Sequence, residues 1–119
     1  MLFPDSNRQL QNRGDEREIE DPLQIDYYNI KKASLVLRSL NHKLRQQIIK
    51  IIAEQKKLTV TEIYVKLRLE QSVASQHLAI LRKSGIVTTQ REGKFIYYTI
   101  NSARIQAIDG FVKDIVGQN

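Results

Sequence analysis

The chain has 119 residues, of which 41% are hydrophobic and 27% are charged, and its formal net charge is +6. That length predicts one domain with a core of its own. The sequence contains no cysteine, which excludes disulfides and thiolate metal sites. No apolar run reaches the ~20 residues of a membrane span. The first residues lack the order of a secretory signal, so we expect a cytoplasmic protein.

The charge of the chain is unevenly distributed. Residues 1–21 carry six acids and three arginines, whereas residues 22–119 carry 16 basic and 7 acidic residues, a net charge of +9. We predict a polar, flexible arm over residues 1–22 and a basic, folded domain over residues 23–119. A basic domain favours a polyanion such as nucleic acid as its partner, although a merely soluble basic protein would carry the same charge.

Two amphipathic helices are predicted at the start of this domain. Asp26 is placed to cap the first, which covers about residues 26–39. Asn41 is placed to cap the second, whose apolar positions recur at helical spacing until the helix ends near Gln55.

A helix-turn-helix pattern follows. Thr59 and Glu62 have the spacing of a capping box, which predicts a short third helix that turns Ile63 and Leu67 inward. After a turn at residues 68–70, a fourth helix is predicted over residues 71–84, and the glycine that follows is a typical helix stop.

After this glycine, the spacing of apolar residues changes from about 3.6 residues, which is typical of a helix, to 2 residues, which is typical of a strand. Residues 86–91 and 94–100 are rich in β-branched and aromatic side chains and are predicted strands, joined by a tight turn at Glu92 and Gly93. The alternation places one set inward, namely Val87, Ile96, Tyr98 and Ile100, and sets Phe95 and Tyr97 on the other side. A last helix begins after Asn101 or Ser102 and has a broad apolar side: Ile105, Ile108, Phe111, Val112, Ile115 and Val116.

The fourth helix carries the functional signal, because the second helix of a helix-turn-helix enters the major groove of DNA. At 100° per residue, Ala74, Leu78 and Leu81 share the inward side. The opposite side is small and polar and has no acid, so it can approach base edges closely. Its residues are Ser72, Gln76, Ala79 and Lys83, with Ser75 at its flank. A solvated helix face that happens to lack acids is the alternative.

The two histidines and the hairpin tip are weaker signals. His77 lies beside the apolar side of its helix, and a partly buried histidine bonded to neighbouring structure is the favoured interpretation. With His42 on another helix, neither a metal site nor a catalytic triad is indicated. Arg91 and Lys94 at the hairpin tip suit phosphate or minor-groove contact, although Glu92 weakens the local positive field.

From residue 40 to residue 100 the sequence resembles the ArsR-type (ArsR/SmtB) winged helix-turn-helix repressors. The family pattern falls on residues 71–87, QSVASQHLAILRKSGIV, and on residues 91–98, REGKFIYY. The resemblance implies a mainly α fold with a β-hairpin wing, in a homodimer that binds a palindromic operator in double-stranded DNA and represses transcription. A winged helix used for protein–protein contact is the alternative, and nothing in the sequence suggests an enzyme.

In that family the first and last helices form the dimer interface. The residues expected there are Tyr27, Ile30, Leu37, Ile105, Ile108, Val112 and Ile115. The residues expected at DNA are Gln71, Ser72, Ser75, Gln76, His77, Lys83, Arg91 and Lys94.

The sequence departs from the family at its metal sites. Members that sense metals use two cysteines where this chain has Thr59 and Thr61, or an Asp, His, His and Glu set on the last helix, where it has only Asp109 and Asp114. A hydroxyl is a poor ligand for these metals. We therefore expect no metal and no cofactor, and the sequence leaves any effector unknown.

Overall fold

The computed structural model describes residues 21–117. The chain divides after Ile30 into two compact units, and helix α1 (Tyr27–Leu40) begins in the first and ends in the second. The Asp26 carboxylate caps α1 by accepting hydrogen bonds from the backbone N–H of Asn29 at 3.1 Å and from its side-chain amide at 2.7 Å. The predicted cap is confirmed, whereas the arm predicted over residues 1–22 lies almost wholly outside the described residues.

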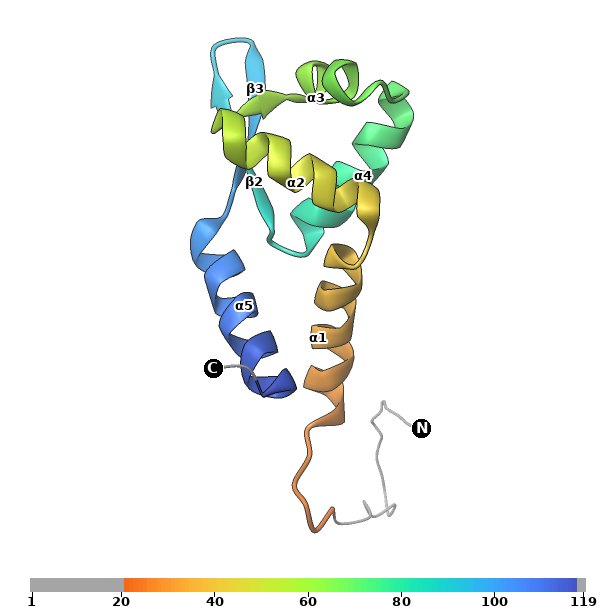
Figure 1. Cartoon of the computed structure of the whole chain (residues 1–119), viewed down its shortest axis with the longest axis vertical. Helices are drawn as coiled ribbons and strands as arrows, with labels where there is room; N and C mark the ends of the chain where they lie inside the picture. Colours follow the sequence, from red (N-terminus) through yellow and green to blue (C-terminus); the bar gives the residue numbers. More distant parts are fainter. Residues whose placement is uncertain (1–20, 118–119) are drawn as a thin grey trace, which may run out of the picture. The chain divides into compact units, whose positions relative to one another are not determined.

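The second unit continues with four helices and a small sheet (Figure 1). The helices are α2 (Lys43–Gln55), α3 (Val60–Leu67), α4 (Gln71–Lys83) and α5 (Ser102–Val116). All four lie within one or two residues of their predicted bounds. No helix in the described part of the chain has the length and apolarity that a membrane crossing requires.

The predicted cap of α2 is wrong by one residue. The backbone N–H of Asn41 bonds to the carbonyl of Leu37 at 3.0 Å, so Asn41 continues the hydrogen-bond pattern of α1 just beyond its last residue. His42 is the N-cap instead, and its Nδ1 accepts from the N–H of Leu44 at 3.2 Å. An imidazole nitrogen replaces the usual amide or hydroxyl oxygen in satisfying an orphan donor.

Local side-chain chemistry sets the bounds of α3. Thr59 accepts from the N–H of Glu62 at 3.2 Å, and Glu62 accepts from the N–H of Thr59 at 2.8 Å, which confirms the capping box. Arg68 ends the helix with a left-handed backbone at φ 56°. The chain then enters α4 after a turn of three residues, as predicted.

The sheet has three antiparallel strands in the order β1-β3-β2: β1 (Leu58–Thr59), β2 (Val87–Glu92) and β3 (Phe95–Ile100). The sequence analysis missed β1, because two residues are too few to show a period. The hairpin turn is at Gly93 and Lys94 rather than Glu92 and Gly93, since Glu92 still pairs with Phe95 across the strands. Gly93 supplies the positive φ of 63°.

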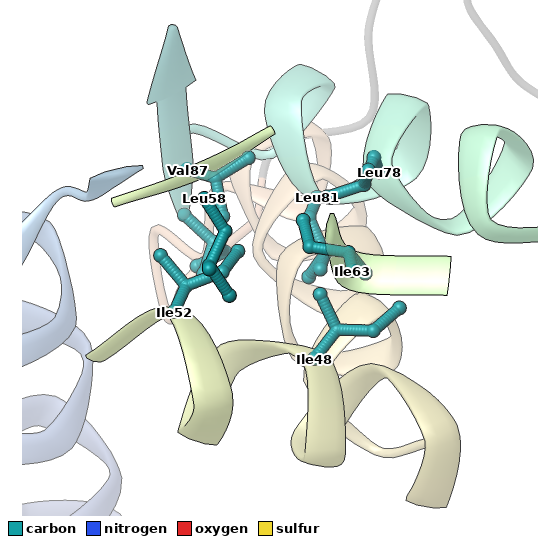
Figure 2. Close-up of a cluster of buried hydrophobic side chains, with 8 residues drawn as sticks. Ile48, Ile52, Leu58, Ile63, Leu78, Leu81 and Val87 are labelled. Carbon is teal, nitrogen blue, oxygen red and sulfur yellow. The ribbon is translucent and has the colours of Figure 1, made fainter. Parts of the chain in front are cut away.

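The core lies between α2, α3, α4 and the base of the sheet. Figure 2 shows isoleucines of α2, leucines of α4 and Val87 of β2 pointing toward one another. The buried cluster consists of Ile48, Ile52, Leu58, Ile63, Leu78, Leu81, Ile86 and Val87.

The strand residues that were predicted to face inward do so only near the core. Val87 is buried, and Tyr98 and Ile100 pack against the cluster. Ile96 was predicted to be inward but is 47% exposed. It shares a strand side with Tyr98, but the wing extends beyond the helices that would cover it.

Candidate nucleic-acid interface

Helix α4 has one buried and one exposed side. Ala74, Leu78 and Leu81 are at most 1% exposed, as predicted. The polar residues of the other side are all exposed to solvent: Ser72, Ser75, Gln76 and Lys83. Gln71 is also exposed, at the first position of the helix. No acidic residue interrupts α4, and Arg82 and Lys83 occupy its last turn. The exposed side is therefore free within the protomer and carries hydrogen-bonding groups and positive charge.

The end of α4 is held by Gly85 and Arg104. Gly85 has φ +77°, a left-handed conformation that most side chains disfavour. Arg104 of α5 donates from Nε to the carbonyl of Ser84 at 3.3 Å. These contacts position the turn that leads from α4 into β2.

His77 is partly buried and bonded to neighbouring structure, which confirms the interpretation favoured from the sequence. Arg45 donates from Nη1 to His77 Nδ1 at 3.2 Å, and the ring of His42 lies 4.8 Å from that of His77. Burial lowers the pKa of His77, and the neighbouring His42 and Arg45 act in the same direction. His77 therefore faces α2 rather than standing among the exposed residues of α4.

The wing is attached to the end of α2 through charge. Lys57 donates to both carboxylate oxygens of Glu92, at 2.6 and 2.8 Å, and this hydrogen bond raises the pKa of Lys57. Lys57 also lies 4.6 Å from the ring centre of Tyr97. Glu92 is thus paired, and Arg91 and Lys94 remain exposed at the tip, as predicted.

A hollow of about 460 Å³ lies between α4 and β3. It is lined by Ser75, Leu78, Ala79, Arg82, Lys83 and Tyr98. The sequence analysis did not select Arg82, although it lies seven residues after Ser75 and so shares its side of the helix. The hollow therefore lies between the exposed side of α4 and the wing strand β3.

The apolar residues expected at a dimer interface differ in exposure. Tyr27, Ile30 and Ile115 are 65%, 51% and 64% exposed. The others are partly buried, and Ile105 and Ile108 pack against the core of their own protomer. Leu35 of α1, which the sequence analysis did not select, is 52% exposed. It lines an apolar groove of about 760 Å³ between α1, α4 and α5.

Two of the positions that correspond to metal ligands in metal-sensing members have other partners here. The Thr59 hydroxyl caps α3, and Asp109 pairs with Lys113 at 2.9 Å. Within residues 21–117, no three His, Cys, Asp or Glu side chains gather closely enough to hold a metal ion.

Comparison with known proteins agrees with this geometry. Residues 42–89 match the model of the bacterial regulatory protein, arsR family. The chain is 36% identical to the transcriptional activator HlyU of Vibrio cholerae over 80 residues, which cover 67% of this chain and 73% of HlyU. It is 33% identical to the transcriptional repressor PagR of Bacillus anthracis over 84 residues, which cover 71% of this chain and 84% of PagR.

The chain belongs to the arsR family. It is a DNA-binding transcriptional regulator with a winged helix fold. The crystal structure of PagR superposes with a TM-score of 0.59 at 31% identity, covering 73% of this chain and 99% of PagR. The relatives include an activator and a repressor, so family membership assigns control of transcription without assigning its direction.

Proposed function

We propose that this arsR-family regulator places the exposed side of α4 in the major groove of its operator. The observation that carries the proposal is the division of α4 into a buried apolar side and an exposed, acid-free polar side. Gln76 can pair with adenine through its amide, and Ser72 and Ser75 can bond to bases or phosphates. Lys83 and Arg82 lie at the end of the helix where phosphates would approach. Positive charge there favours binding to any duplex.

The wing supplies the second contact. Arg91 and Lys94 stand exposed at its tip, whereas the nearest acid, Glu92, is paired with Lys57. Two exposed cations on a protruding hairpin suit phosphates or a narrow minor groove. The pairing of Glu92 lowers its repulsion toward a phosphate backbone, because Lys57 offsets its charge.

The active form in this proposal is a homodimer. Within the second unit, Leu35 and Phe111 are exposed and line the groove between α1, α4 and α5, and Ile115 and Val116 of α5 are also exposed. Water solvates such an apolar surface poorly. A second copy of the chain would cover this surface, with the predicted interface residues Tyr27, Ile30, Leu37, Ile105, Ile108, Val112 and Ile115 contributing. Two-fold symmetry would then set two copies of α4 about one helical turn apart on a palindromic operator. The proposed activity is binding, and repression would follow from blocking the promoter.

Selection of bound sites from a random duplex pool tests the proposal. The purified chain should enrich a palindrome whose half-sites are separated by about one helical turn. Gel shifts should favour this duplex over a scrambled one, and the affinity for both should fall steeply with salt. Failure to enrich any sequence, together with no retention on heparin at low salt, would favour a protein–protein contact module instead.

A further inference from the structure

Arg45 is a buried cation that has no carboxylate partner among the described residues. It is 8% exposed, and its three hydrogen bonds go to two backbone carbonyls and one imidazole. Buried charges are usually retained with a specific set of partners, because removing one side leaves an uncompensated group. The partners of Arg45 therefore indicate what the residue does.

Two of the bonds fasten α2 to the end of α1. Arg45 Nε donates to the carbonyl of Ser39 at 2.6 Å, and Nη2 donates to the carbonyl of Arg38 at 3.2 Å. Carbonyls in the last turn of a helix carry the negative end of the helix dipole. The Arg38 carbonyl also accepts from the backbone N–H of Asn41 at 3.2 Å. The positive charge of Arg45 is thus offset by helix geometry instead of by an acid.

The third bond reaches α4. Arg45 Nη1 donates to His77 Nδ1 at 3.2 Å. Within the part of the chain that the structure describes, it is the one hydrogen bond between a side chain of α4 and another helix. The packing of Ala74, Leu78 and Leu81 holds α4 against the core, but apolar contact is not directional. A hydrogen bond requires alignment, so it limits rotation of the helix about its own axis.

We propose that Arg45 is a positioning residue that sets the rotation of α4 through His77 and thereby aligns Gln76 with the bases. His77 and Gln76 are adjacent on the helix, so any rotation that breaks the Arg45 bond turns Gln76 by the same angle. The inference rests on the proposed function, since the rotation of α4 affects base reading only if α4 lies in the groove. It adds that a buried residue on another helix contributes to sequence discrimination without touching DNA.

Two substitutions at His77 test this proposal in the full chain. His77→Asn keeps an acceptor near the position of Nδ1, and His77→Leu removes it. The readout is the ratio of dissociation constants for a scrambled duplex and the selected operator, measured by fluorescence anisotropy at a temperature where circular dichroism shows each variant folded. We expect His77→Leu to lower this ratio about tenfold, as for loss of a charged hydrogen bond. His77→Asn should keep most of it. Helix propensity alone would give the opposite order, because Leu favours helix more than Asn.

Substitutions at Arg45 test the same hydrogen bond from its donor side. Arg45→Lys keeps the charge but not the three-way fork, and Arg45→Met removes both. Lys50→Met on the exposed side of α2 is the control for loss of one positive charge. We expect the ratio to fall in the order native, Arg45→Lys, Arg45→Met, with Lys50→Met weakening both duplexes equally. The double variant Arg45→Met with His77→Leu should be no less selective than Arg45→Met alone, because both changes remove one interaction.

Gln76→Ala, measured beside these variants, distinguishes failure of the positioning inference from failure of the proposed function. If Gln76→Ala lowers the ratio but both His77 variants leave it within about twofold of native, Arg45 has only a structural role and the positioning inference is overturned. If Gln76→Ala also leaves the ratio unchanged, α4 does not read bases, and the proposed function fails together with the inference. Should the Arg45 variants not fold, the His77 pair alone still decides between these outcomes.

Discussion

Lys57, just after α2, holds both carboxylate oxygens of Glu92, at the end of β2, within 2.8 Å of its ammonium nitrogen. The two residues are 35 positions apart in sequence, and the pair ties the wing to the helical body. It also cancels a negative charge close to the exposed cations of the wing tip. This pair leads to the first prediction.

Glu92→Gln should strengthen binding to every duplex. The substitution removes the acid and leaves Lys57 free to meet a phosphate, so affinity should rise about twofold to fivefold at low salt and the salt dependence should steepen. Glu54→Gln, an equal change of charge on an exposed part of α2, is the control. Anisotropy titrations at several salt concentrations provide the measurement. Weaker binding by Glu92→Gln would instead mean that the Lys57–Glu92 pair helps DNA binding more, by holding the wing in place, than the Glu92 charge hinders it by repulsion.

Gln76→Ala should relax base preference, and Lys83→Ala should not. A bidentate amide contact to a base contributes about 1–3 kcal/mol of discrimination, whereas a lysine contact to phosphate is the same for all sequences. Gel shifts on operator and scrambled duplexes distinguish the two. Lys94→Ala at the wing should behave like Lys83→Ala. Equal effects of Gln76→Ala and Lys83→Ala on the two duplexes would contradict the assignment.

Ile115→Glu should convert the proposed dimer into monomer. Ile115 is 64% exposed within the protomer, so a charge there should disturb the single chain little. At a dimer contact the same charge would be buried without a partner. Gln106→Glu is the control, because nine residues at 100° place it on the opposite side of α5. Sedimentation velocity at micromolar concentration gives the result. A dimer that survives Ile115→Glu would exclude this side of α5 as the interface.

Gly85→Ala should destabilise the fold more than Gly93→Ala. Both glycines have positive φ, at +77° and +63°, which costs other residues about 1–2 kcal/mol. At Gly85 an added Cβ would also lie 3.3 Å from Arg104 Nε, whereas at Gly93 it would meet nothing within 4 Å. Both variants therefore introduce the same backbone strain, but only Gly85→Ala also disturbs the hydrogen bond from Arg104 to the carbonyl of Ser84. Urea unfolding of the two variants measures the difference, and equal losses would show that the arginine contact contributes nothing.

Stability should fall as the pH drops below the ordinary His pKa of 6.5, in part because of His77. Burial and the neighbouring His42 and Arg45 lower the pKa of His77 in the folded chain. The unfolded chain then binds the proton more tightly, so acid favours unfolding until the pH passes below the folded pKa. Urea unfolding at pH 7.5 and 5.5 should show a smaller pH effect in His77→Asn than in the native chain. An unchanged pH effect would assign it to other groups.

Much of the helical architecture could be predicted because its determinants are local. The capping box of Thr59 and Glu62 spans three residues, and the buried side of α4 follows from the spacing of Ala74, Leu78 and Leu81. Each of these signals compares residues within one or two turns. The exposed polar side of α4 could be predicted for the same reason, since it is what the apolar spacing leaves outside.

Tertiary structure alone decided which distant residues meet. Strand β1 exists only because Leu58 pairs with Tyr98, and Ile96 is exposed because the helices that cover Tyr98 do not extend along the wing. Arg45 and His77 are 32 positions apart, and no local sequence pattern at either position predicts that they are in contact. Periodicity reports which side of an element turns inward. Packing determines what it meets there, and so which polar residues hold the candidate interface in place.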